Sequence, residues 1–144
     1  MSEELGGPYL ALAVFCESVI EDKHGVLSLI RVIDRTIVTA TGSEAPETMP
    51  AFPMNATMVV AFKSGFAKGS HRVKIRPINP DGKLFPEVMV PMHLEGDDRG
   101  QNLILPFRMV LEQEGLYWFE IYVGEALFTR MPFRVIYQRA SIQS

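Results

Sequence analysis

Residues 113–126 read Gln113-Glu114-Gly115-Leu116-Tyr117-Trp118-Phe119-Glu120-Ile121-Tyr122-Val123-Gly124-Glu125-Ala126. A glycine stands two residues before a tyrosine, large residues follow, and a Gly-Glu pair precedes the next apolar run. This order predicts a corner, a strand and a tight hairpin, as found where a β-sandwich chain passes between its sheets. The stretch therefore favours an all-β domain, although it indicates no chemistry.

Gly115 and Tyr117 are the candidate structural corner. In such corners the tyrosine ring packs at the sandwich end, and its hydroxyl bonds a backbone group a few residues upstream. Immunoglobulin domains carry a cysteine two residues after this tyrosine, but Phe119 stands there. We therefore expect a core that is held by apolar packing, without an intersheet disulfide.

Composition limits the class of protein. The 144 residues, 47% of them hydrophobic, suit one domain with a substantial core. A net charge of −3 argues against a protein that mainly binds polyanions, so nucleic acid is an unfavoured partner. One cysteine, Cys16, excludes an internal disulfide and a multi-cysteine zinc site.

The beginning of the sequence is acidic where a secretory signal would be basic. No run approaches the roughly 18 apolar residues that are needed to span a bilayer. We therefore expect a cytoplasmic protein with no membrane partner.

Alternation and turn residues predict about eight strands, within a range of 7–9, in a single antiparallel β-sandwich of immunoglobulin-like or jelly-roll type. We expect a flexible lead-in at 1–8, the domain at 9–138 and a polar tail at 139–144. The runs 9–20 and 26–40 should form a long hairpin. The other expected strands are 57–63, 71–77, 88–92, 103–105, 116–123 and 126–137. Between them we expect a long loop at 41–56, an acidic loop at 95–100 and, after Pro106, a crossing segment at 107–114.

Four parts of the sequence carry a family resemblance: Phe15-Cys16-Glu17 with residues 22–35, Gly69-Ser70-His71, Asn79-Pro80-Asp81-Gly82, and the closing Gly-x-Tyr strand with its hairpin. In these parts the chain resembles a family of small uncharacterised bacterial proteins. The resemblance extends over nearly the whole chain and implies a bacterial protein with an immunoglobulin-like or jelly-roll sandwich. It implies no reaction, ligand or catalytic residue.

Arg72, Lys74 and Arg76 alternate with Val73 and Ile75. The three cations should project from one strand face, about 6–7 Å apart. Such a stripe could bind phosphate, nucleic acid or an acidic partner, or it could be a solvated face that discourages edge pairing. No aromatic residue is expected between the cations on the outward face, as base stacking would require.

Glu17, Arg31, Asp34 and Arg35 form a candidate polar network that we expect to be buried, because strand alternation places Glu17 and Asp34 among apolar neighbours. If the first two strands pair, a carboxylate can meet an arginine across the hairpin. Such a network either fixes strand register or forms a ligand or partner site. A further alternative is an enzyme built on Glu17, Arg31 and Asp34. Cys16 is expected to pack in the core, because nothing in the sequence places a base beside it.

His93, Glu95, Asp97 and Asp98 could ligate a metal, but their spacing fits no calcium loop. We expect a turn there, with no metal and no cofactor. The sequence has no nucleophile elbow, phosphate-binding glycine loop or dinucleotide fingerprint. We therefore predict no catalytic residue and no enzyme activity.

Trp118 and Tyr122 alternate with Tyr117 and Phe119, so both faces of this strand carry aromatic side chains. Outward aromatic residues indicate a contacting surface. We expect a non-catalytic protein-interaction or self-associating module that contacts a partner protein or a second copy, as a homodimer. Its candidate surface is Trp118, Tyr122, Arg72, Lys74 and Arg76. The alternative is a small-ligand or anion-binding sandwich that uses the Arg72, Lys74 and Arg76 face with the 41–56 loop.

Overall fold

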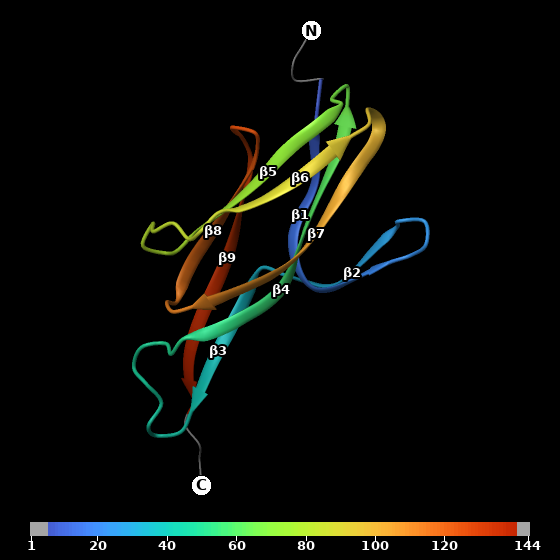
Figure 1. Ribbon diagram of the computed structural model, residues 1–144. Coiled ribbons are helices and arrows are strands. Elements are labelled where there is room, and N and C mark those ends of the chain that lie inside the picture. The colour runs from blue at the N-terminus through green and yellow to red at the C-terminus, as the bar shows by residue number, and fades with distance from the viewer. Residues whose placement is uncertain (1–5, 141–144) are drawn as a thin grey trace.

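The computed structural model describes residues 6–140, which form nine β-strands in two packed sheets (Figure 1). One sheet has the strand order β2-β1-β4-β7, and the other has the order β3-β9-β8-β5-β6. The strands are β1 (Tyr9–Glu21), β2 (Leu27–Ile33), β3 (Arg35–Thr41), β4 (Phe52–Gly65), β5 (Gly69–Ile78), β6 (Val88–Leu94), β7 (Asp97–Leu111), β8 (Gly115–Val123) and β9 (Ala126–Ala140). The predicted all-β sandwich is confirmed, with β3 and β9 as a parallel pair. No helix among residues 6–140 is long and apolar enough to cross a membrane.

The two sheets enclose a core of phenylalanine, methionine and aliphatic side chains. The ring of Phe15 lies 4.9 Å from that of Phe119 and 5.2 Å from that of Phe133, and Phe107 lies 5.5 Å from Phe119. These edge-to-face contacts are the favoured geometry for aromatic pairs. Phe119, at the usual cysteine position, therefore joins the sheets through an aromatic cluster.

The sandwich corner is present. Tyr117 is 1% exposed, and its hydroxyl donates a hydrogen bond to the carbonyl oxygen of Gln113 at 2.7 Å. Gly115 has a φ of 133° and approaches Pro80 so closely that a Cβ would lie 2.9 Å from the proline ring. Only glycine suits this position. The hairpin through Gly124 joins β8 to β9, as the sequence predicted.

The expected long strand at 26–40 is wrong. It divides at Asp34 into β2, which pairs with β1, and β3, which joins the other sheet beside β9. Residues 35–41 find a full row of parallel backbone partners along residues 134–140. Local alternation cannot encode this choice, because it depends on a strand almost a hundred residues away.

Two expected loops and the expected crossing segment are shorter than predicted. Residues 52–56 of the 41–56 loop begin β4, and Thr41 ends β3. Residues 107–111 of the expected crossing segment pair with residues 52–56, which extends both strands. Residues 97–100 of the expected acidic loop belong to β7. Residues 52–56 contain a proline and residues 97–100 are mostly charged, but each of the three segments has a paired neighbour that completes its backbone bonds.

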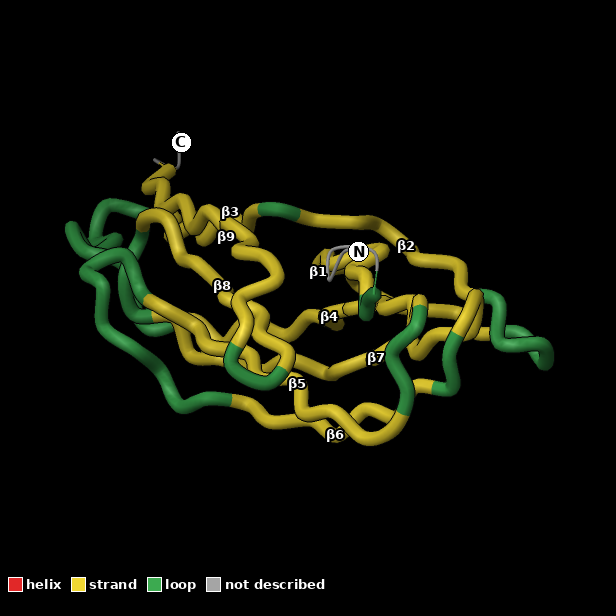
Figure 2. The backbone as a smooth tube through the Cα atoms, turned by 90° about the horizontal axis from the view of Figure 1, so that it is seen from above, coloured by secondary structure: helices red, strands yellow, loops and turns green. Residues whose placement is uncertain are grey.

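Pro106 does not end its strand. β7 is an edge strand and tolerates a residue that has no amide hydrogen. Pro91 likewise lies on β6, the edge strand of the other sheet. In the view from above, β6 and β7 lie side by side where the two sheets meet (Figure 2). Of the expected tail, residues 139–140 belong to β9; residues 141–144 and residues 1–5 of the lead-in lie outside the described residues.

Candidate functional site

The register of β5 against β8 brings the two predicted surfaces together. Lys74 pairs with Tyr122 and Arg76 pairs with Glu120, so their side chains share the outer face of the five-stranded sheet. Trp118, two residues before Glu120, lies on the same face. Aromatic residues therefore do lie beside the cations, contrary to the expectation from β5 alone, because they come from the neighbouring strand.

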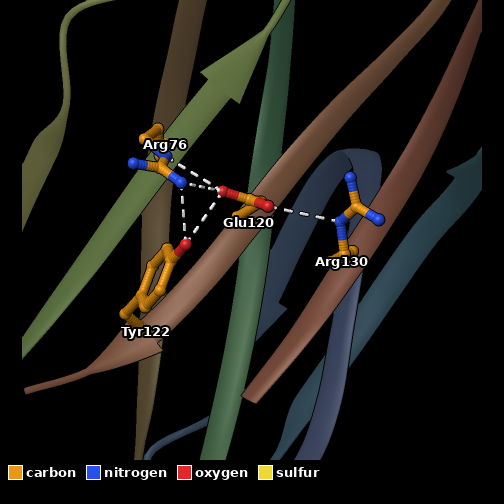
Figure 3. A network of polar contacts seen from close by, with 4 residues as sticks. All are labelled: Arg76, Glu120, Tyr122 and Arg130. Carbon is orange, nitrogen blue, oxygen red and sulfur yellow. Dashed lines mark hydrogen bonds and ion pairs between the residues drawn. The ribbon is translucent and has the colours of Figure 1, made fainter. Parts of the chain in front are cut away.

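Glu120 is the centre of this face (Figure 3). Its Oε1 accepts hydrogen bonds from Arg76 Nε at 2.9 Å and from the Tyr122 hydroxyl at 3.0 Å, and Arg76 Nη2 lies 2.7 Å away. Its Oε2 lies 3.3 Å from Arg130 Nε. Arg76 Nη2 also donates to the Tyr122 hydroxyl at 2.9 Å. The carboxylate is only 7% exposed, so its charge is almost fully satisfied by three neighbours.

These contacts set the protonation state of the cluster. Burial raises the pKa of Glu120, but hydrogen bonds from Arg76 and Tyr122, with the charges of Arg76 and Arg130, outweigh burial and lower the pKa below 4.5. Burial and the bond to Glu120 raise the pKa of Tyr122 above 10.0. At neutral pH the cluster therefore holds a carboxylate, a neutral phenol and two guanidinium groups.

The aromatic rings are held under cations. Lys74 Nζ lies 4.6 Å from the ring centroid of Tyr122, and Arg76 Cζ lies 5.3 Å from it. Arg130 Cζ lies 4.9 Å from the ring centroid of Trp118. Each geometry is within the range of cation–π attraction. The rings and the cations thus form one ordered layer.

We call this outer surface of the five-stranded sheet the basic face. Glu120 is the only acid on it among the strand residues described, and six of the chain's fourteen lysines and arginines project from it. They are Arg35, Arg72, Lys74, Arg76, Arg130 and Arg134. No ion pair among the described residues involves Arg72, Lys74 or Arg134. The face is thus strongly positive on a chain whose net charge is −3.

One end of the basic face is hollowed. An open depression of about 490 Å³ is lined by Arg72 and Lys74 on β5, by Met89 and Pro91 on β6, and by Gly124 of the β8–β9 turn, with Ser70, His71 and Glu125 at its border. The loop at 42–51 lies elsewhere, beyond the end of β3, and its Pro46 accepts a bond from Tyr137 (Figure 1). The structure therefore does not bring the expected loop and the basic strand together.

The candidate polar network divides into two exposed pairs. Arg31 Nη1 lies 2.5 Å from Glu17 Oε1 across the β1–β2 hairpin, and Arg35 Nε lies 2.9 Å from Asp34 Oδ1. The expectation of a buried set is wrong, because the edge of β2 and the crossing at Asp34 are open to solvent. Glu17, Arg31 and Arg35 border a cleft of about 520 Å³ with an apolar floor, whereas Asp34 lies outside it.

Cys16 is fully buried, but it lies on the outer side of the four-stranded sheet and is absent from the intersheet core. Burial raises the pKa of its thiol. Glu95 pairs with Arg99, and the described residues contain no cluster of three histidine, cysteine or acidic side chains that could share a metal.

Sequence reasoning missed Glu120 and Arg130. Their contacts join residues 44 and 10 positions apart and depend on the registers of β5, β8 and β9. One signal was present, because Glu120 stands at an outward position between two aromatic residues on a strand that precedes a hairpin. An acid there needs cationic neighbours if it is buried.

The corner tyrosine, the aromatic cluster and the β3–β9 edge define an immunoglobulin-like β-sandwich with a basic outer face. The model of a family of unknown function, DUF6941, matches residues 11–136, and the chain belongs to this family. The resemblance noted from the sequence is thereby confirmed.

An immunoglobulin-like protein from Pseudomonas aeruginosa is similar over 91% of this chain and 98% of its own, with 14% identity and a TM-score of 0.45. A CARDB domain from Pyrococcus furiosus, in complex with di-metal ions, is similar over 89% of this chain and 90% of its own, with 15% identity and a TM-score of 0.42. No curated protein matches the sequence.

Proposed function

We propose that this protein is a non-catalytic interaction module that binds an acidic segment of a partner protein on its basic face. The observation that carries the proposal is the layer around Glu120, where Arg76, Arg130 and Tyr122 are fixed by mutual contacts. Ordered side chains lose little conformational entropy on binding. Arginine, tyrosine and tryptophan are also the residues most enriched in binding hot spots.

Charge favours an acidic partner over a second copy on this face. If two basic faces were in contact, the six cations of one copy would lie against the six cations of the other. Like charges brought together in an interface cost several kcal/mol. An acidic segment would instead pair with Arg72, Lys74 and Arg134, which have no ion pair among the described residues. Apolar side chains of the segment would pack on Trp118, which is half-buried.

The test is fluorescence anisotropy with a fluorescein-labelled peptide in which glutamates flank a phenylalanine. We expect the peptide to bind the wild-type chain and to lose at least tenfold in affinity to the variant Arg72→Glu/Lys74→Glu. The control Lys23→Glu/Lys83→Glu makes the same change in net charge at exposed turn and loop positions. It should bind nearly as tightly as the wild type.

Two results would overturn the proposal. One is equal binding by both charge-reversal variants, since the peptide would then sense net charge alone. The other is tighter binding of a labelled single-stranded oligonucleotide with the same sensitivity to Arg72→Glu/Lys74→Glu. That result would make the face a nucleic-acid surface.

A second candidate function is binding of a small anion in the depression beside Arg72 and Lys74. The observation in its favour is that both cations border a hollow of about 490 Å³, a size typical of ligand sites. Arg76 is a weaker anion ligand than the sequence suggested, because Glu120 already engages it. Compared with the anion site expected from the sequence, this candidate site uses the same strand face but not the 41–56 loop.

Thermal unfolding with phosphate, nucleoside phosphates and dicarboxylates tests this second candidate. A ligand at about a hundred times its Kd stabilises the folded chain by about 2.7 kcal/mol, a shift of several degrees in Tm. We expect Lys74→Ala to abolish the shift and Lys83→Ala to preserve it. An unchanged Tm across the panel would remove the anion candidate and leave the peptide proposal standing.

A further inference from the structure

The outer face of the four-stranded sheet is unusually apolar. Strand register places three rows of side chains across β1, β4 and β7, and the central row is Val14, Val59 and Ile104. The row above holds Leu12, Ala61 and Asn102, and the row below holds Val32, Cys16, Thr57 and Pro106. None of the three rows contains a charged residue. We call this surface the apolar face.

The side chains on the inner side of the same strands pack in the intersheet core, whereas the residues of the apolar face are absent from that core. Antiparallel sheets with one face on the core normally carry polar residues on the other. Here Val59 is fully buried by its neighbours and Val32 is 58% exposed. Among residues 6–140 the five-stranded sheet packs on the opposite side, and no strand covers the apolar face.

We propose that a second copy of the chain packs on the apolar face and forms a two-fold dimer. An uncharged surface requires an uncharged complement, and the described strands offer the same surface on another copy. A two-fold contact needs one self-complementary patch only. Small and β-branched side chains such as Val14, Val59 and Ala61 make a flat surface that suits sheet-on-sheet stacking.

The size of the apolar face sets the expected affinity. With the next row, in which Ser18 and Ile30 lie beside Asn55 and Arg108, the face covers four strands about 4.8 Å apart over about eight residues of 3.3 Å, an area of about 500 Å². Two copies would bury about 1,000 Å², at the lower limit of specific interfaces. We therefore expect a dissociation constant in the micromolar range. This inference does not depend on the basic face or its partner.

Analytical ultracentrifugation over a concentration series tests the dimer. The wild-type chain of 16.2 kDa should approach twice that mass at about 100 µM. Val32→Glu, at a 58% exposed position, should remain monomeric with little change in Tm. The control Ile37→Glu introduces the same charge at a 51% exposed position on β3 and should still dimerise. Val32→Glu should also keep its affinity for the acidic peptide.

Val32→Thr is the milder variant, because it keeps the shape and the β-branched side chain. Val32→Thr should weaken the dimer several-fold. If Val32→Glu fails to fold, this variant still decides the sedimentation test. A wild-type chain that stays monomeric up to about 1 mM would overturn the inference. Equal loss of the dimer in Ile37→Glu would overturn it too, since the contact would then lie on the other sheet.

Discussion

Among single residues, Glu120 is unusual because a carboxylate on the outer face of a sheet is normally solvated, yet this one is 7% exposed. Arg76 and Arg130 approach it from two neighbouring strands, so it fixes β5, β8 and β9 relative to one another. Removing it would leave two cations close together without their shared anion. Its effect should therefore exceed that of a surface ion pair.

Glu120→Gln should lower the free energy of unfolding at pH 7 by about 1 to 2 kcal/mol, as for a hydrogen-bonded charged group. The folded-state pKa of Glu120 lies below its ordinary value of 4.5, so the unfolded chain binds the proton first. Its contribution is present above pH 4.5 and is lost as the pH falls through the folded-state pKa. The variant should therefore show a flatter loss of stability in acid, measured by urea unfolding. Glu17→Gln is the control, because its pair with Arg31 is exposed.

Tyr117→Phe removes one hydroxyl from the corner and should cost about 1 to 2 kcal/mol, because the carbonyl of Gln113 loses its donor. Tyr137→Phe loses a comparable bond to Pro46 in an exposed position and should cost less. Thermal unfolding of the two variants measures the difference. Equal effects would contradict a special role for the corner.

At the scale of elements, the boundary between β2 and β3 decides how the chain divides between the sheets. Arg31 has a φ of 57°, in the left-handed region that residues other than glycine seldom occupy. The conformation lies three residues before the crossing at Asp34. Side-chain alternation could not reveal this local irregularity in β2, because an arginine, unlike a glycine, does not indicate a positive φ.

Three substitutions at Arg31 separate backbone strain from the ion pair with Glu17. Arg31→Ala removes the pair and keeps the strain, whereas Arg31→Gly removes both. Arg31→Gly should therefore be more stable than Arg31→Ala by about 0.5 to 1 kcal/mol, measured by urea unfolding. Arg31→Val should be the least stable, since a β-branched residue tolerates this φ poorly. If Arg31→Ala proved more stable than Arg31→Gly, the result would contradict backbone strain at Arg31.

Elements that depend on neighbouring residues in the sequence could be predicted, whereas elements that depend on a distant strand could not. The corner at Gly115 and Tyr117 and the final hairpin were predictable, because turn chemistry and alternation lie within a few residues. The division at Asp34 and the continuation of β7 through Pro106 were not, because both depend on which strand lies alongside. The candidate surface was predictable in part. Arg72, Lys74, Arg76, Trp118 and Tyr122 were named, but their union on one face required the β5–β8 register.

On the scale of the whole molecule, the two outer faces of the sandwich differ in kind. Six cations and one acid project from the described strands on the basic face, and the three central rows of the apolar face carry no charge. Electrostatic and apolar contacts respond in opposite ways to salt, because ions screen charges and favour apolar burial. The same solution change can therefore distinguish the two proposed surfaces.

Raising sodium chloride from about 50 to 300 mM should weaken acidic-peptide binding at least tenfold, because the Debye length falls from about 14 to about 6 Å and each peptide charge then senses only its nearest cations. The dimer constant should change by less than about twofold or become tighter. Anisotropy and sedimentation on one sample measure both. Val32→Glu should retain the salt-sensitive peptide binding without the dimer, and Arg72→Glu/Lys74→Glu should retain the salt-insensitive dimer without the peptide. If both variants lose both properties, the two faces act as one surface and their separate assignment fails.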